Sequence, residues 1–267
     1  MKFNESFRDM VHNSFLYLRS RWRGLSGSDR FGNEEPSVVN MQLAFSDQFS
    51  SFDALKWRIG QPWGAFHPDS PNQYYGEDSV SVRLGKLALA QQYRPKTFTT
   101  DREYLIPYSV GLVTSYETFG YGFYEFEAIL PNGPGLWPAI WLGCYDTWPP
   151  EIDIIEAYSD LDSNYGLNLQ SNLHFGKTPN KSAAGARNHL VTGHNLPLKL
   201  SCWITENFIK IYYNGYLVRE VTSEHTLKWF RDKKYMILLN NGVRPGFESC
   251  DPEQYSEFLI NYVRVWQ

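Results

Sequence analysis

The chain has 267 residues, of which 42% are hydrophobic and 20% are charged, a composition typical of a globular protein and unlike that of a disordered chain. Lys and Arg number 25 against 29 Asp and Glu, so the formal net charge is −4 and no general attraction to the phosphates of a nucleic acid is expected. No apolar run approaches the roughly 18 residues that a membrane-spanning helix needs.

The first 40 residues differ in pattern from the rest of the chain. Their apolar side chains recur at helical spacing between arginines, at Phe3, Phe7, Met10, Val11, Phe15, Leu18 and Trp22. This spacing predicts an amphipathic helix, followed by a linker rich in Gly, Ser and Asp over 24–33. We expect the helix to dock on the main domain, with a partner or a membrane surface as alternatives. The expected organisation is thus a helix and linker over 1–40 and one β domain over 41–267.

From residue 41 onward, short alternating segments separated by turn residues predict an all-β fold. One face of a strand is formed by Tyr124, Phe126, Ala128 and Leu130. The dipeptide Asn214-Gly215 lies between two apolar runs and predicts a hairpin with a type I′ turn. In the last segment, 258–266, strict alternation groups Leu259, Asn261, Val263 and Val265 on one face.

The run from Glu151 to Glu156 places three carboxylates among residues that otherwise belong in a core. Burying charge is costly unless the charge is used. Strict alternation would put Glu151 and Asp153 on one face and Glu156 on the other, but one extra residue, a β-bulge, returns Glu156 to the first face. Two carboxylates on either side of a glycosidic bond are what hydrolysis with retention of configuration requires. The alternative interpretation is an edge strand with solvated acids.

The run EIDIIE, with its Glu-x-Asp-x-(x)-Glu spacing, resembles the signature of glycoside hydrolase family 16 in its longer, bulged form. Further segments follow the order of that family, at 72–75, 79–89, 109–115, 120–131, 135–142, 172–175, 235–241 and 261–267. The resemblance, which covers about residues 41–267, implies a β-jelly-roll sandwich of two antiparallel sheets of the concanavalin-like type. It implies a laminarinase-, agarase- or carrageenase-like endo-acting hydrolase.

By this resemblance Glu151 is the nucleophile, Glu156 is the general acid and base, and Asp153 hydrogen-bonds the nucleophile. These roles require a raised pKa for the acid and a low pKa for the nucleophile. Because Asp153 stands between the two glutamates, it can share a proton or place negative charge near Glu156. We therefore treat the three carboxyl groups as one coupled titrating unit.

The resemblance also implies substrate-binding residues. Trp141 and Trp148 match a stacking platform for sugar rings, and Trp137 is equally compatible with the platform and with the core. His174 matches a histidine that lies near the acid/base in this family, where it can contact substrate or tune Glu156. Asn72 is a further candidate for contact with a sugar hydroxyl.

Other features of the sequence bear on cofactors and location. No organic cofactor is required for the implied reaction. Family members often hold a structural Ca²⁺ through an Asp of the final strand, where this chain has Asn261, and a neutral amide binds a hard cation less well. The three cysteines, at 144, 202 and 250, lack metal-site spacing and allow one disulfide at most. No export signal is visible, whereas the resemblance implies an extracellular or periplasmic enzyme.

The expected activity is a retaining endo-β-glycosidase acting on β-1,3- or mixed-linkage β-1,3/1,4-glucan. The main alternative is an endo-β-galactanase acting on polysaccharides of the agar or carrageenan type. Gly111-Leu112-Val113 lacks the arginine that β-1,3-glucanases of the family commonly have there, and Glu156-Ala157-Tyr158 is similar to the agar- and carrageenan-cleaving branches. A carbohydrate-binding lectin of the same fold, which does not cleave, is the alternative from another class. The oligomeric state is left open.

Overall fold

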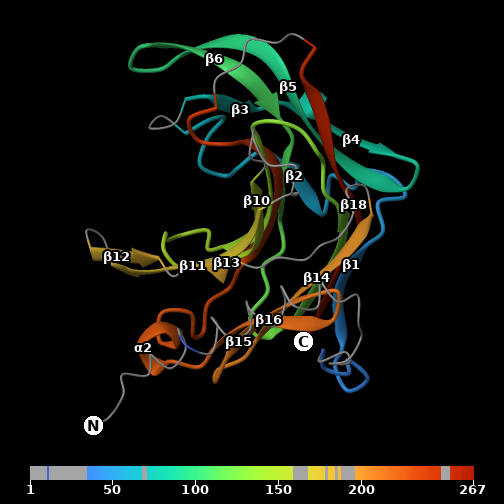
Figure 1. Ribbon diagram of the computed structural model, residues 1–267, viewed down its shortest axis with the longest axis vertical. Helices are drawn as coiled ribbons and strands as arrows, with labels where there is room; N and C mark the ends of the chain where they lie inside the picture. Colours follow the sequence, from blue (N-terminus) through green and yellow to red (C-terminus); the bar gives the residue numbers. More distant parts are fainter. Residues whose placement is uncertain are drawn as a thin grey trace.

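The computed structural model describes Val11 and residues 35–67, 71–158, 168–177, 180–183, 186–187, 196–247 and 253–267. Two β-sheets form two layers, as Figure 1 shows, with the β5–β6 hairpin extending at one end and the short helix α2 (Glu224–Leu227) at the other. A 3₁₀ turn, η1 (Glu77–Ser79), precedes β4. The predicted all-β sandwich is confirmed.

Ten strands make up one sheet, which we call the outer sheet. In spatial order they are β16 (Tyr216–Val221), β15 (Ile209–Tyr213), β14 (Pro197–Ile204), β8 (Gly122–Ile129), β18 (Tyr255–Trp266), β5 (Lys86–Thr99), β6 (Glu103–Val110) and β3 (Gln73–Tyr75), with β1 (Leu43–Asp47) beside β18 and β4 (Val80–Arg83) beside β5. Strands β3 and β6 run parallel, so this sheet is mixed and not purely antiparallel as expected.

Eight strands make up the second sheet, which we call the acid-bearing sheet. In spatial order they are β12 (Asn180–Ala183), β11 (Asn168–Lys177), β10 (Glu151–Tyr158), β9 (Leu136–Gly143), β17 (Met236–Val243), β7 (Leu112–Ser115) and β2 (Trp57–Ile59), with β13 (Ala186–Arg187) beside β11. Strand β10, which carries the three acids, is therefore an interior strand with β9 and β11 as its neighbours. The alternative of a solvated edge strand is wrong.

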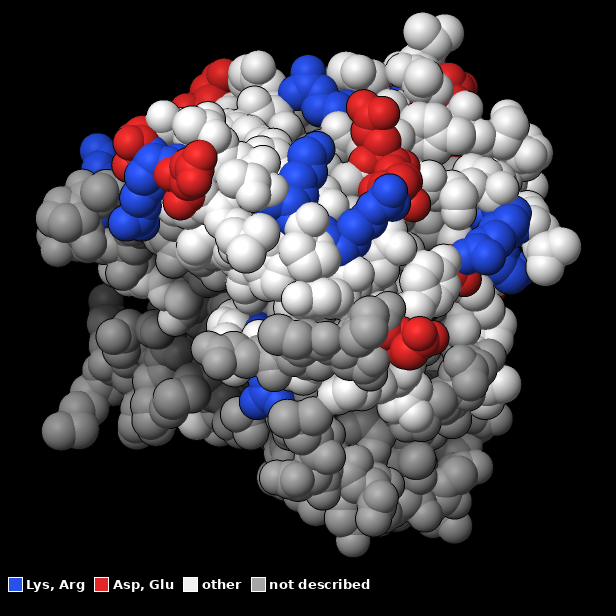
Figure 2. Space-filling model, turned by 90° about the horizontal axis from the view of Figure 1, so that it is seen from above, with Lys and Arg blue, Asp and Glu red and all other residues white. Residues whose placement is uncertain are grey.

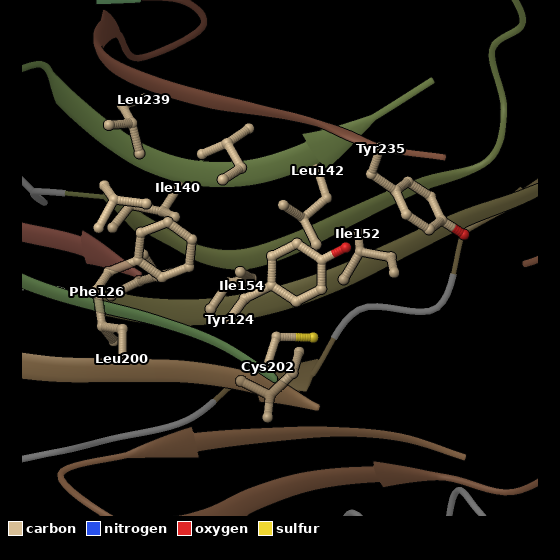
Figure 3. Close-up of a cluster of buried hydrophobic side chains, with 14 of the residues drawn as sticks. Tyr124, Phe126, Ile140, Leu142, Ile152, Ile154, Leu200, Cys202, Tyr235 and Leu239 are labelled. Carbon is tan, nitrogen blue, oxygen red and sulfur yellow. The ribbon is translucent and has the colours of Figure 1, made fainter. Parts of the chain in front are cut away.

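The main core lies between the two sheets. Figure 3 shows Ile152 and Ile154 of β10 pointing from the acid-bearing sheet toward Tyr124, Leu200 and other side chains of the outer sheet. All four of these side chains are fully buried. Burial of this apolar surface, at about 25 cal/mol per Å², is the main force that holds the two sheets together. It also fixes which face of β10 turns away from the core.

Two local expectations for the strands can be compared with the structure. Asn214 and Gly215 have φ values of 50° and 81°, which confirms the type I′ turn between β15 and β16. In β18 the strict alternation is wrong beyond Ile260. A bulge between Ile260 and Tyr262 shifts the register, so Phe258 and Ile260 share the core face with the two last valines of the strand.

The predicted N-terminal helix lies outside the described residues apart from Val11, which is helical. Glu35, which lies in the region 1–40 that was expected outside the β domain, packs on the outer sheet, where its carboxylate pairs with Lys199 and accepts a 2.5 Å hydrogen bond from Ser201 Oγ. Within the described part of the chain, no helix combines the length and the apolar character that crossing a bilayer requires. Lys and Arg lie intermixed with Asp and Glu on the face seen in Figure 2, without a continuous surface of one sign.

Candidate active site

A β-bulge at Ile154 brings the three acids of β10 to one face. Asp153 pairs with Asn172 of β11, but Glu156 pairs with Gln170, so β10 holds one residue more than β11 between these two pairs. The register of β10 with β9 shifts at the same place. The isoleucines of the strand remain in the core, and the acids lie on the opposite face. The bulge predicted from the sequence is therefore present.

The acids are buried although they lie on the face away from the core. Asp153 is 4% exposed and Glu156 is 7% exposed, and the side chain of Glu151 is 15% exposed. Such low values mean that neighbouring side chains rise around the carboxyl groups. A ligand that reaches them would be bound among these side chains and largely shielded from water.

Glu151 is contacted by two groups from neighbouring segments. The indole N–H of Trp148 donates a 3.0 Å hydrogen bond to Glu151 Oε2, and His174 Nε2 lies 3.5 Å from Glu151 Oε1. The rings of Trp148 and His174 are 5.7 Å apart. Both contacts stabilise the ionised form of Glu151, the histidine when it is protonated.

Glu156 has a separate set of partners. Its Oε1 accepts hydrogen bonds from Trp137 Nε1 (3.1 Å) and from the hydroxyl of Tyr158 (2.9 Å). Its Oε2 accepts one from Gln170 Nε2 (3.1 Å). The Trp137 and Tyr158 rings stack with centroids 5.5 Å apart, which fixes both donors. The orientation of Glu156 is thus set by three side chains from three strands.

The position of His174 differs from the expectation. His174 Nε2 lies 3.3 Å from Asp153 Oδ2 and, as above, next to Glu151, so it borders the first two acids. It was expected beside Glu156. The antiparallel register explains the difference, because Glu151 pairs with His174 while Glu156 pairs with Gln170. Asn172 Nδ2 lies 3.1 Å from the same ring nitrogen.

All three predicted tryptophans lie on the acid-bearing side. Trp148 is 45% exposed, whereas Trp137 and Trp141 are half-buried. Trp141 donates its indole N–H to Asn240 Oδ1 of β17 at 2.8 Å, and its side chain stays partly accessible. Trp148 thus lies at Glu151, Trp137 lies at Glu156 and Trp141 pairs with Asp153 between them, so the rings run along the acid cluster, as a binding surface for a chain of sugars would require.

Asn72 lies in the turn directly before β3. The next residue, Gln73, reaches the acid-bearing sheet, where its side-chain oxygen accepts a 2.5 Å hydrogen bond from the backbone N–H of Val243 in β17. Val243 lies at the end of β17 that pairs with Leu136, next to Trp137. Contact of Asn72 with a substrate stays a prediction.

Burial is the main cause of the raised pKa values of Glu151 and Asp153. It raises the pKa of Glu151 to about 8, and the charge of Asp153 adds to this rise, whereas His174 and the Trp148 N–H oppose it. Burial also holds the pKa of Asp153 well above its usual range; Glu156 adds to this effect, and the buried Arg219 opposes it. The low pKa expected for Glu151 is therefore not present in the free protein, because burial and, second, the neighbouring Asp153 charge raise it.

A proton on Asp153 reconciles the raised pKa of Glu151 with the ionised form that a nucleophile requires. Asp153 is the most deeply buried of the three, and burial is the main cause of its raised pKa, which favours its protonated form. When Asp153 is neutral, its repulsion of a charged Glu151 disappears, which favours ionisation of Glu151.

One group of described side chains has the composition of a metal site. Ligand atoms of Glu151, Asp153 and His174 all lie within 4.8 Å of one another. One imidazole and two carboxylates suit a divalent transition metal. Glu151 and Asp153 are predicted catalytic residues and His174 is a predicted substrate-binding residue, and acid–base chemistry at the carboxyl groups needs no metal.

The surroundings of Asn261 do not fit the structural calcium site that family members often hold at this position. Asn261 Nδ2 donates a 2.6 Å hydrogen bond to Glu127 Oε1, and Asn261 Oδ1 is buried with no hydrogen-bond partner among the described residues. One amide oxygen and one carboxylate fall short of the six to eight oxygens that Ca²⁺ takes. We assign calcium no part in the chemistry.

Three residues of the site were missed in the sequence: Tyr158, Gln170 and Asn240. A signal existed for two of them. Tyr158 lies two residues beyond Glu156 and so shares its face, and Gln170 belongs to the alternating polar series Asn168, Gln170, Asn172 and His174. Asn240 gave no such signal, because it follows an apolar run in the interior strand β17.

Residues 69–246 match the family model described as glycosyl hydrolases family 16. The chain belongs to this family. The resemblance seen in the sequence is thereby confirmed, and the buried acids on β10 are those of the family's Glu-x-Asp-x-(x)-Glu signature.

Relatives of this family 16 protein include endo-1,3-1,4-beta-glycanase EglC of Rhizobium meliloti (strain 1021), 38% identical over 219 residues, with 80% of this chain and 43% of that protein covered. Glucan endo-1,3-beta-glucosidase A1 of Niallia circulans is 25% identical over 272 residues, with 87% and 39% covered. The solved laminarinase catalytic domain from Thermotoga maritima MSB8 shares the fold, with a TM-score of 0.68, 21% identity, and 85% and 98% of the two chains covered. The family 16 chain thus spans less than half the length of these two curated relatives.

Proposed function

We propose that this family 16 protein is an endo-acting glycoside hydrolase that cleaves a β-linked glucan with retention of configuration. The observation that carries the proposal is the bulge at Ile154, which puts Glu151, Asp153 and Glu156 on one face, where Asp153 and Glu156 are buried and Glu151 is partly buried. Burying carboxyl groups is costly, so a strand with a purely structural role would not be expected to carry three of them in this position.

The proposed reaction has two displacements. The ionised carboxylate of Glu151 attacks the anomeric carbon while Glu156 donates its proton to the glycosidic oxygen, so that the bond to the leaving sugar breaks and a glycosyl ester with Glu151 forms. Glu156, now a carboxylate, then takes a proton from a water molecule. The resulting attack on the same carbon releases Glu151 and a product with the original anomeric configuration.

The contacts in the free protein give the two glutamates separate partners. Trp148 and His174 hold Glu151, and the proton on Asp153 favours its charged form. Trp137 and Tyr158 fix Glu156 on the opposite side of Asp153. The two reacting groups are thereby held by different segments, so each keeps its own orientation when a sugar lies between them.

The substrate class rests on the relatives. By name, the Niallia circulans relative is a glucan endo-1,3-beta-glucosidase and the Rhizobium meliloti relative is an endo-1,3-1,4-beta-glycanase. We therefore propose β-1,3- or mixed-linkage β-1,3/1,4-glucan as the substrate. An agar- or carrageenan-type galactan is the competing substrate class.

The test uses the full chain with laminarin, lichenan, agarose and carrageenan. We expect new reducing ends from laminarin or lichenan, and ¹H NMR of the first products should show the β anomer before mutarotation. New reducing ends from agarose or carrageenan alone would show that the protein is an endo-β-galactanase and not a β-glucanase. Binding without cleavage of any polymer would contradict the hydrolase and favour a lectin.

A further inference from the structure

The bulged residue Ile154 is held from the opposite sheet. It has no partner residue in the register of β10 with either β9 or β11. Its backbone carbonyl instead accepts a 2.8 Å hydrogen bond from the hydroxyl of Tyr213. Tyr213 and Ile154 are both fully buried, so this bond crosses the core between the two sheets.

Tyr213 is itself fixed in place. It is the last residue of β15 and directly precedes the type I′ turn at Asn214-Gly215. It pairs with Leu200 of β14 on one side and with Tyr216 of β16 on the other. Its hydroxyl is therefore presented to β10 from the rigid tip of a paired hairpin.

A second side chain of the same hairpin contacts the neighbouring strand. Arg219 of β16 is 2% exposed, and its Nη1 donates to the carbonyl of Ser171 at 2.9 Å and to Ser171 Oγ at 3.3 Å. Ser171 lies between Gln170 and Asn172, the two residues of β11 that pair with β10 on either side of the bulge. The β15–β16 hairpin thus supports both strands at the interruption of the ladder.

The position of the bulge decides where Glu156 points. A buried carbonyl that is left without a donor costs about 1 to 3 kcal/mol, so the bulge is favoured where its free carbonyl finds a partner. If the extra residue lay beyond Glu156 instead of before it, strict alternation would turn Glu156 into the core. The hydroxyl of Tyr213 favours the register that keeps the three acids on one face.

We propose that Tyr213 is a positioning residue for the hydrolysis. By bonding the Ile154 carbonyl from the opposite sheet, it holds the bulge of β10 at the place where Glu156 faces the same side as Glu151. Tyr213 touches no substrate. The inference rests on the proposed function, since it concerns the geometry of the two carboxylates named there.

The first test compares Tyr213→Phe with a matched control. The change removes one hydroxyl and keeps the buried ring. Tyr235→Phe is the control, because Tyr235 is 1% exposed and its hydroxyl also donates to a backbone carbonyl, that of Phe230, at 2.9 Å. We expect Tyr213→Phe to lower kcat by about 10- to 100-fold with KM within about twofold, since a small displacement of a reacting group is costly. Tyr235→Phe should keep the kcat of the unaltered protein, although both variants melt at a lower temperature.

The second test deletes Ile154. The remaining sequence, Glu-Ile-Asp-Ile-Glu, alternates without a bulge, so the acids stay on one face and each carbonyl of β10 can join the ladder. Tyr213→Phe should then lower neither kcat nor the melting temperature further in the deletion background. Such non-additivity would show that the hydroxyl acts through the bulge.

Equal kcat values for Tyr213→Phe and Tyr235→Phe would overturn the inference, as would additive effects of Tyr213→Phe and the deletion. If the unaltered protein cleaved no glycan while the two changes still coupled in melting temperature, the proposed function would fail and the link between Tyr213 and the bulge would stand. The two failures are therefore distinguishable.

Discussion

Asp153 controls the charge of the acid cluster through its position between the two glutamates. It is 4% exposed, it lies 3.3 Å from His174 Nε2, and burial holds its pKa well above the usual range. A neutral Asp153 removes repulsion from Glu151, while an ionised Asp153 raises the pKa of Glu151. The active protonation state therefore depends on a residue that forms no bond to the sugar.

Asp153→Asn tests this dependence. Asparagine carries no charge, so the pKa of Glu151 should fall below its value of about 8 in the unaltered protein. We expect the acidic limb of the pH profile of kcat/KM to move to lower pH. An acidic limb that stays in place or moves upward would contradict the coupling between the two carboxyl groups.

Trp141 is expected to bind sugar through its exposed ring face. Trp141→Ala should raise KM for a soluble β-glucan about tenfold, which corresponds to about 1.4 kcal/mol of lost binding, with a smaller change in kcat. Trp203→Ala is the matched control, because Trp203 is also half-buried but lies in β14 of the outer sheet. The assignment of the platform fails if the two variants raise KM equally.

At the scale of the strand, the bulge in β10 could be predicted from the sequence, but the hydrogen bonds that hold it from the opposite sheet could not. Strict alternation places Glu156 on the other face, so the expectation that the three acids act together, and the resemblance to the bulged form of the family motif, required one extra residue between them. The bond from Tyr213 to Ile154 joins residues 59 positions apart in opposite sheets, and no local pattern signals it. His174 was placed beside the wrong glutamate because the register of β10 against β11 depends on contacts that the sequence does not show.

The hairpin that carries Tyr213 depends on Gly215. Its φ of 81° lies in the left-handed region, where a side chain costs about 1 to 2 kcal/mol. Gly215→Ala should therefore lower the free energy of unfolding by about 1 kcal/mol, measured by denaturant titration. An unchanged midpoint would contradict the type I′ geometry of this turn.

At the scale of the whole molecule, the buried acids lower stability as the pH rises. Burial raises the pKa of Glu151 from 4.5 to about 8, so between these values the folded protein keeps a proton that the unfolded chain has released. Stability from this group is therefore full below about pH 4.5 and is lost as the pH rises toward 8. The sandwich core, which buries large apolar side chains from both sheets, offsets this cost.

Glu151→Gln should therefore stabilise the fold, and the stabilisation should be larger at pH 8 than at pH 5. Glutamine has no proton to lose, so we expect the gain in melting temperature over the unaltered protein to be larger at pH 8 than at pH 5. Each kcal/mol of unfolding free energy that the substitution restores should raise the melting temperature by about 2 to 4 °C. Thermal melts followed by circular dichroism measure the melting temperatures of the two proteins at each pH. A gain that is equal at the two pH values would show that Glu151 is ionised throughout this range.

The most direct test of the account is the release of reducing ends from laminarin by the unaltered protein, by Glu151→Gln and by Glu127→Gln. Glu127 lies in β8 of the outer sheet and bonds Asn261, so its substitution controls for loss of a carboxylate elsewhere. We predict that Glu151→Gln lowers the rate at least about 10³-fold while the fold and the binding of laminarin oligosaccharides persist, and that Glu127→Gln cleaves normally. Cleavage by Glu151→Gln at the rate of the unaltered protein would contradict the central claim that the acid-bearing face of β10 performs the hydrolysis.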